Sequence, residues 1–186
     1  RTWSMDSVIR YIKVNGGPEK GEGVLVGLKD GMCLKIFIDN DFPVELVNHG
    51  ASVRCLDMSA FRKKLAVVDE NSAVVVYDVK TKAVLFEGKG ANSVAFNSVY
   101  EDMFCYAGDG ILSIKTADFP VHTQNLEGFA VGFNASKIYC LHNISMQTVV
   151  VPHSWSVKNY IKKGESAAHP PPTLSSGRLK FKNRFQ

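Results

Sequence analysis

The sequence predicts an all-β fold built from repeated units of about four short strands. Short runs that alternate apolar and polar residues, or that are rich in β-branched residues, are separated by turn residues throughout positions 1–151. No apolar stripe with helical spacing interrupts them. The arrangement returns after about 40 residues, which is the length typical of one four-stranded propeller blade.

The strand-like runs fall into four groups along the chain. We expect strands at 9–14, 24–28, 32–38, 44–47, 53–58, 65–68, 73–79, 83–86, 94–96, 103–106, 111–115, 131–133, 138–141 and 148–151. The groups define about four blades, at 8–49, 50–89, 90–127 and 128–151. The last group lacks a run for its outer strand.

Tight turns recur at matching places in the first three groups, with offsets of 40 and 39 residues. The expected hairpin residues are Asp30, Gly31, Glu70, Asn71, Asp109 and Gly110. An Asp-Gly pair supplies the positive φ that a primed hairpin turn requires, so each pair is expected to close its own hairpin. A ring of cation ligands formed by the acids of these turns is the alternative, which we rank below the hairpin role.

The second group carries a further mark of this architecture. Its third run ends in Tyr77-Asp78, in the place of the Trp-Asp pair of WD repeats, and the first group has Phe37-Ile38-Asp39 there. The Gly-His pair expected at the start of such a blade is absent throughout. We therefore predict a degenerate WD40-type β-propeller. Because the chain begins at Arg1 rather than Met, we expect a piece of a larger ring whose end blades expose apolar faces.

Charge divides the chain in two. The 22 Lys and Arg residues exceed the 18 Asp and Glu residues by four, but residues 152–186 hold seven basic residues and one acid, which leaves −2 for residues 1–151. The basic excess is therefore poor support for nucleic-acid binding by the folded part. Residues 152–186 are also rich in Pro and Ser. We predict a partial propeller over 1–151 and a disordered basic tail over 152–186.

No pattern in the sequence predicts catalysis. Phosphate-binding glycine loops, a nucleophile elbow and the zinc-protease motif are missing, so we expect no enzyme activity, cofactor or metal site. The histidines are expected to be structural or exposed. The apolar runs are too short for a transmembrane helix, and the first residues lack the pattern of a secretory signal, which favours a reducing interior. Buried reduced thiols are expected at Cys33, Cys55, Cys105 and Cys140.

The end of the chain offers one candidate contact surface, in which basic and aromatic residues are interleaved. Its members are Arg178, Lys180, Phe181, Lys182 and Arg184. This composition suits an anionic membrane or a nucleic acid. We rank that interpretation below a solvated end whose charge keeps the chain soluble.

Several long stretches resemble one family. The resemblance lies in SMDSVIRYIKVNGGPEKGEGVLVGLKDGMCLKIFID at 4–39, SVRCLDMSAFRKKLAVVDEN at 52–71, ANSVAFN at 91–97 and NASKIYCLH at 134–142. These stretches are similar to part of the second propeller of the WD-repeat subunit of intraflagellar transport complex A that is named for its mass of about 122 kDa. We expect the resemblance to cover residues 1–151 and to stop at Pro152, where the helical repeats of the family should follow.

The resemblance implies a non-catalytic, protein-binding scaffold. It implies roles in retrograde ciliary transport, cilium assembly and the ciliary entry of membrane proteins. The implied partners are other subunits of complex A and ciliary membrane cargo adaptors, with no small-molecule substrate and no nucleic acid. The implied locations are the cilium, the basal body at its base and the cytoplasm. The alternative function is a propeller carrier whose basic tail tethers it to anionic membrane or nucleic acid.

Overall fold

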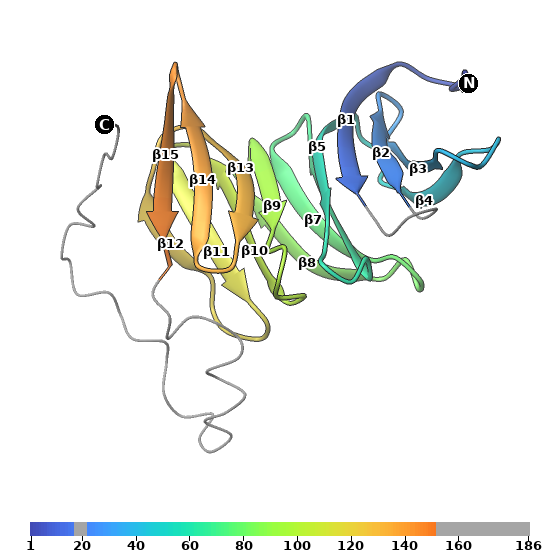
Figure 1. Ribbon diagram of the computed structural model, residues 1–186. Coiled ribbons are helices and arrows are strands. Elements are labelled where there is room, and N and C mark those ends of the chain that lie inside the picture. The colour runs from blue at the N-terminus through green and yellow to red at the C-terminus, as the bar shows by residue number, and fades with distance from the viewer. Residues whose placement is uncertain (17–21, 152–186) are drawn as a thin grey trace.

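The computed structural model describes residues 1–16 and 22–151. These residues form four antiparallel sheets that follow one another along the chain and stand side by side in a curved row (Figure 1). We call the sheets blades 1 to 4. The described part of the chain contains strands and turns and no helix, so the predicted all-β propeller fold is confirmed.

Blades 1 to 3 each have four strands, hydrogen-bonded in chain order. Blade 1 consists of β1 (Ile9–Gly16), β2 (Gly23–Leu28), β3 (Met32–Phe37) and β4 (Val44–Asn48). Blade 2 consists of β5 (Val53–Met58), β6 (Lys64–Asp69), β7 (Ala73–Asp78) and β8 (Val84–Lys89). Blade 3 consists of β9 (Ser93–Phe96), β10 (Met103–Gly108), β11 (Ile111–Thr116) and β12 (His122–Asn125).

Blade 4 has three strands within the described residues, and these are β13 (Phe129–Asn134), β14 (Lys137–His142) and β15 (Ser145–Val150). The first strands of neighbouring blades contact one another, β1 against β5, β5 against β9 and β9 against β13. We call β1, β5, β9 and β13 the inner strands. They form a continuous row to which the other strands of each blade are attached.

A hydrophobic core lies between each pair of neighbouring blades. Leu25 and Leu65 belong to the core between blades 1 and 2, and Val74 and Phe104 to the core between blades 2 and 3. Ile138 of blade 4 packs into a third core against blade 3. Because each of these three cores takes apolar faces from two sheets, neighbouring blades stabilise one another. A fourth cluster lies on blade 1 alone, where Val26, Leu28 and Ile36 are covered by Trp3 and Met5.

Two polar contacts between blades join residues that lie about one repeat apart in the sequence. The Asp57 carboxylate accepts a hydrogen bond from the amide of Phe96, 39 positions later, with Oδ2 and N 2.8 Å apart. The Asn97 side-chain amide donates to the carbonyl of Ala135, 38 positions later, at 2.7 Å. Equivalent positions of successive blades are thus brought together by the stacking of the sheets.

The predicted strands agree with the structure except at the outer edges of the blades. The sequence analysis expected no strand at β12, whose residues His-Thr-Gln-Asn are mostly polar. It expected β15 to begin at Thr148, whereas this strand begins at Ser145. Edge strands are exposed on one side and need no apolar alternation, so the pattern that identifies buried strands misses them.

Candidate interaction surface

The first predicted hairpin turn, at Asp30-Gly31, joins β2 to β3. Gly31 has a φ of 93°, a conformation that glycine adopts without strain. A Cβ atom there would also lie 2.5 Å from the backbone nitrogen of Gly50. Any other residue at this position would therefore have both a strained φ and a steric clash. The carboxylate of Asp30 accepts a hydrogen bond from the amide of Met32 at 3.0 Å. The turn is held by its own residues.

The second and third hairpins differ from each other in geometry. Between β6 and β7 the positive φ falls on Ser72 (61°) and not on Glu70 or Asn71. Between β10 and β11 both Asp109 (53°) and Gly110 (74°) have positive φ, as a two-residue primed turn requires. The primed geometry expected from an Asp-Gly pair is therefore found in the third hairpin and not in the first two.

The acids of the three turns do not converge. Within residues 1–16 and 22–151, no group of three or more His, Cys, Asp or Glu side chains is placed to hold a metal ion. His142, which follows Cys140 by two positions, lies 3.3 Å from the Glu127 carboxylate through its Nε2 atom. In the described part of the chain, no helix is long and apolar enough to cross a membrane.

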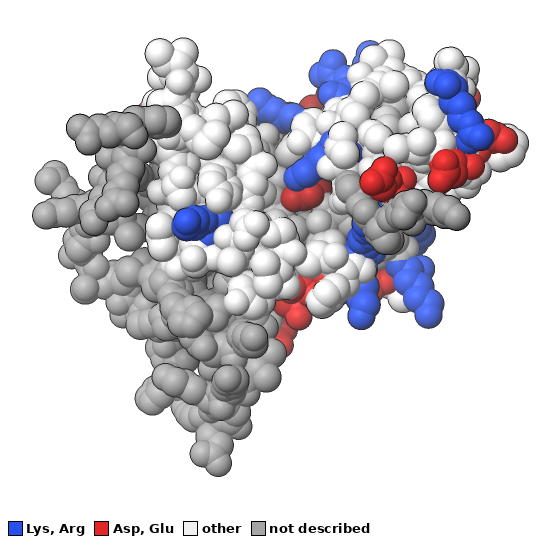
Figure 2. Space-filling model, in the orientation of Figure 1, with Lys and Arg blue, Asp and Glu red and all other residues white. Residues whose placement is uncertain are grey.

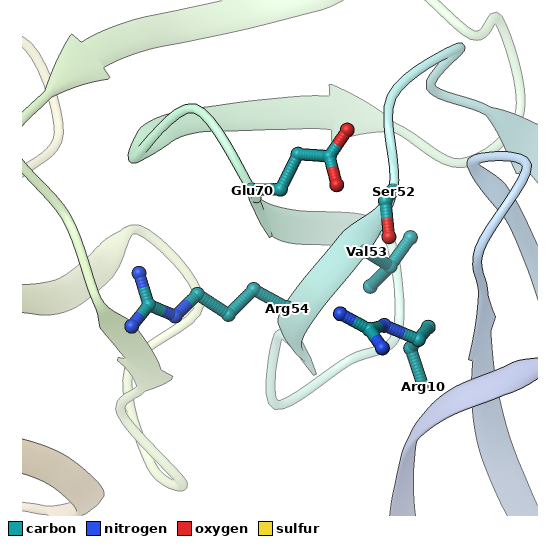
Figure 3. Close-up of a pocket in the computed structure, with 5 residues that line it drawn as sticks. All are labelled: Arg10, Ser52, Val53, Arg54 and Glu70. Carbon is teal, nitrogen blue, oxygen red and sulfur yellow. The ribbon is translucent and has the colours of Figure 1, made fainter.

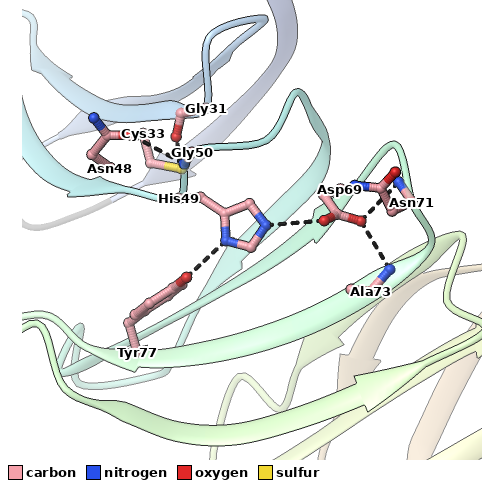
Figure 4. Close-up of polar contacts among 9 residues, drawn as sticks. All are labelled: Gly31, Cys33, Asn48, His49, Gly50, Asp69, Asn71, Ala73 and Tyr77. Atoms are coloured by element: carbon pink, nitrogen blue, oxygen red, sulfur yellow. Dashed lines mark hydrogen bonds and ion pairs between the residues drawn. The ribbon is translucent and has the colours of Figure 1, made fainter.

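A buried polar network joins blades 1 and 2 (Figure 4). The Tyr77 hydroxyl lies 2.7 Å from Nδ1 of His49, and Nε2 of His49 lies 3.3 Å from Oδ2 of Asp69. Oδ1 of Asp69 accepts hydrogen bonds from the amides of Asn71 and Ala73, both at 2.9 Å. The side chains of His49 and Asp69 are only 6% and 7% exposed.

In this arrangement Nε2 of His49 can donate to the Asp69 carboxylate while Nδ1 accepts from the Tyr77 hydroxyl. Burial raises the pKa of Tyr77, with smaller contributions from Cys33, Glu87 and Asp69, so its hydroxyl keeps the proton that it donates. The sequence does not predict this network, because its members lie in different blades. The one local signal is His49-Gly50, the reverse of the Gly-His order of WD repeats.

Two hollows lie at opposite ends of the inner strands. One, of about 310 Å³, is lined by Arg10, Ser52, Val53, Arg54 and Glu70, near the beginnings of β1 and β5 (Figure 3). The other, of about 440 Å³, is lined by residues from the second halves of all four inner strands. Neither was predicted, because their walls come from separate blades.

The larger hollow contains an ion pair between blades 1 and 2. Lys13 Nζ lies 2.8 Å from Oδ1 of Asp57. The same carboxylate accepts hydrogen bonds from the amides of Met58 and Phe96, each at 2.8 Å. Asp57 therefore connects three successive blades. Its charge is balanced by Lys13 and by hydrogen bonds from backbone amides.

A largely uncharged, apolar surface covers one face of blade 4. Phe129 is paired with Leu141 across β13 and β14, and Leu141 with Met146 across β14 and β15, so these three side chains form one row. All three are exposed. Figure 2 shows an almost charge-free area over β13–β15, whereas charged residues gather over blade 1. Apolar patches of this kind identify contact surfaces.

The four cysteines are buried, as predicted. Burial raises the pKa of Cys33 to about 12, with a smaller contribution from nearby Asp30, and that of Cys140 to about 11. The candidate tail contact at 178–184, from Arg178 to Arg184, and the predicted disordered segment 152–186 lie outside the described residues. Both stay predictions.

Comparison with known proteins identifies the family. The family described as the IFT122 second β-propeller matches residues 1–146, which is more than three quarters of the chain. The chain belongs to the IFT122 family. Two relatives, the Xenopus tropicalis and Homo sapiens proteins named intraflagellar transport protein 122 homolog, are each 56% identical to it over 163 residues.

These matches cover 88% of this IFT122-family chain but only 14% of the Xenopus protein and 13% of the human one. The chain thus spans about one seventh of its relatives. The matched length exceeds that of residues 1–151, so the similarity continues past Pro152, where we expected it to stop. The limit at Pro152 is therefore too early, since the change in composition there does not coincide with the end of the similarity.

Solved structures agree with the fold. The WD40 repeats of RRP9 superpose with a TM-score of 0.58 at 13% identity, covering 78% of this chain and 49% of that one. The structure of U3-55K gives a TM-score of 0.60 at 13% identity, covering 83% and 52%. At such low identity the likeness concerns architecture alone, and it supports the WD40-type arrangement of the blades.

Proposed function

We propose that this chain is a non-catalytic, protein-binding scaffold that acts as part of intraflagellar transport complex A. The observation that carries the proposal is its 56% identity to the proteins named intraflagellar transport protein 122 homolog, together with the match to the second propeller of that family. The blades supply the physical basis, because stacked sheets hold their loops and faces in fixed relative positions.

We further propose that the chain contributes to retrograde ciliary transport, cilium assembly and the entry of membrane proteins into cilia. Its partners would be other subunits of complex A and ciliary membrane cargo adaptors. It would act in the cilium, at the basal body and in the cytoplasm. These finer proposals rest on the family resemblance.

Recognition by such a platform is geometric. Loops at the ends of the blades provide side chains of varied chemistry, while the cores between blades limit the movement of those loops. The row of Phe129, Leu141 and Met146 on blade 4 would contact a further part of the longer protein, because an exposed apolar sheet face is stabilised when another sheet covers it. The chain would thus be one segment of a larger propeller.

Affinity capture from ciliated cells tests the proposal. A full-length relative is expressed with its own segment corresponding to residues 1–146, and in parallel with that segment replaced by an unrelated WD40 propeller of equal blade number. We expect the first protein to recover other complex A subunits and the replaced protein to lose at least one of them. Equal recovery by the two proteins would contradict a scaffold role for this segment.

A further inference from the structure

The residues that precede β1 lie across one face of blade 1. Trp3 and Met5 pack on an apolar cluster of this face, whose buried members are Val26, Leu28 and Ile36. Half-buried and exposed residues alternate from Trp3 to position 7. A period of two is that of an extended chain with one side turned toward a sheet. We call residues 1–8 the strap.

The strap covers a face that is covered by a sheet in the other three blades. On blade 2 the corresponding face, which carries Leu65, is buried against blade 1. On blade 3 it carries Phe104 and is buried against blade 2, and on blade 4 it carries Ile138 and is buried against blade 3. The cluster under the strap is therefore of the kind that forms contacts between blades.

The strap is held by its two apolar side chains and by exposed polar contacts. Nε1 of Trp3 donates a hydrogen bond to the carbonyl of Asn40 at 3.0 Å, and a guanidinium nitrogen of Arg1 lies 3.5 Å from the Asp41 carboxylate. Residues 1–8 belong to no strand. A segment with few buried contacts and exposed hydrogen bonds can detach at a lower free-energy cost than a whole blade.

Blade 4, at the opposite end of the row, presents a face of the complementary kind (Figure 1). The exposed row of Phe129, Leu141 and Met146 lies on the side that packs against the following blade in blades 1 to 3. The chain covers 49% and 52% of the two solved WD40 chains, so two copies match the length of one such chain. Two copies joined at both ends by head-to-tail contacts would close into a ring.

We propose that the strap is a removable cover, and that its release lets blade 1 take the exposed face of blade 4 of a second copy of this chain. The contact would repeat the one that joins blades within the chain, with the second copy's blade 4 in the position of a preceding blade. With the strap in place the chain stays monomeric, because Trp3 and Met5 already cover the cluster. The proposal goes beyond the scaffold function and concerns contacts between copies of the chain.

Sedimentation velocity of the 186-residue chain over a range of concentrations tests the strap. We expect the unsubstituted chain to be monomeric. Trp3→Ser/Met5→Ser opens the apolar cluster and should form dimers at least about tenfold more tightly than the unsubstituted chain does. Phe42→Ser/Phe61→Ser is the matched control, because it removes two exposed apolar rings outside the strap, and it should change self-association less than about twofold.

A further pair of substitutions tests which faces meet. Leu141→Lys/Met146→Lys places two charges on the exposed face of blade 4, so adding it to the open-strap variant should abolish the dimers. The combined variant still has an open blade 1, so mixing it with the unsubstituted chain should give a one-to-one complex. The absence of a complex in the mixture, or dimers that survive the two lysines, would overturn the proposal.

A chain that begins at Ser7 gives a second open variant, because it lacks Trp3 and Met5 but keeps every strand. It should dimerise as tightly as Trp3→Ser/Met5→Ser, and far-ultraviolet circular dichroism checks that both variants keep their β structure. If both unfolded, the strap would be an essential part of blade 1, and the proposal would be wrong. These outcomes concern the purified chain, so they are distinguishable from a failure to capture complex A subunits, which would contradict the scaffold function itself.

Discussion

Blades 2 and 4 are built from the same kind of strands but differ in their surroundings. Blade 2 contributes to a core on each of its faces, with Leu65 packed toward blade 1 and Val74 toward blade 3. Blade 4 contributes to one core through Ile138. Leu141, on the opposite face of the same strand, is exposed. The alternation of apolar residues is similar in both blades. The difference teaches that the pattern of a strand determines which faces can be buried, and the neighbouring sheet decides which of them are.

The largest expected effect comes from a matched pair of leucine substitutions. Leu65→Ala creates a cavity between blades 1 and 2 and should lower the free energy of unfolding by about 4 kcal/mol. Leu141→Ala, on the exposed face of blade 4, should lower it by less than about 1 kcal/mol. Urea denaturation of the two variants measures both values. Equal losses would mean that the outer face of blade 4 is covered in solution.

The second prediction concerns the carboxylate that connects three blades. Asp57→Ala leaves Lys13 and the amide of Phe96 without their partner, and should lower the free energy of unfolding by about 3 kcal/mol. Asp57→Asn keeps an oxygen that can accept from Phe96 and should cost about half as much. Urea denaturation is again the measurement. If the two variants were equally unstable, the hydrogen bond to blade 3 would contribute nothing.

A third prediction compares thiol reactivity in blades 1 and 4. Only the thiolate reacts with iodoacetamide, and burial raises the pKa of Cys33 to about 12 but that of Cys140 to about 11. At pH 8 we therefore expect both cysteines to be labelled more slowly in the native protein than in denaturant, Cys33 more slowly than Cys140, and both rates to rise as the pH rises. Mass spectrometry of digested peptides reads both sites in one molecule. The two rates should become similar in denaturant, and a faster reaction of Cys33 in the native protein would contradict the prediction.

The smallest expected effect comes from removing one hydroxyl group. Tyr77→Phe leaves Nδ1 of buried His49 without its partner and should lower the free energy of unfolding by about 1 kcal/mol. Tyr139→Phe is the matched control, because this residue lines the larger hollow and its hydroxyl makes no hydrogen bond within residues 1–16 and 22–151, and it should change stability by less than about 0.5 kcal/mol. Thermal unfolding compares the two variants. Indistinguishable melting temperatures would mean that the hydrogen bond between Tyr77 and His49 does not stabilise the contact between blades 1 and 2.

Much of the fold could be predicted because local and global preferences agree within a blade. The run from Ala73 to Asp78 is β-branched and buried, and Asp109-Gly110 favours the positive φ that its hairpin adopts. β12 could not be predicted, since His122–Asn125 is an edge strand whose side chains need not be apolar. The difference between these cases is burial, which creates the pattern that a sequence can reveal.

The candidate site was much less predictable than the fold. A single arginine in a strand looks like any solvated charge, and nothing near Arg10 or Arg54 in the sequence indicates that each occupies a bulge beside the same hollow. The network of His49 was missed for the same reason, because its partners Asp69 and Tyr77 lie in the next blade. A search for residues about one repeat apart with complementary charge could have found the contact between Lys13 and Asp57, but not the hollow beside Arg10.

By itself, the sequence determined that the chain is all-β, that its strands come in groups repeating about every 40 residues, and where hairpins such as Asp109-Gly110 turn. These properties follow from the φ and ψ preferences of single residues and from alternating burial along a strand. Only the tertiary structure decided that Asp57 connects three blades and that Arg10 and Arg54 share a hollow. Those contacts depend on how sheets stack across one repeat, and the distance between sheets is set by cores to which many residues contribute together.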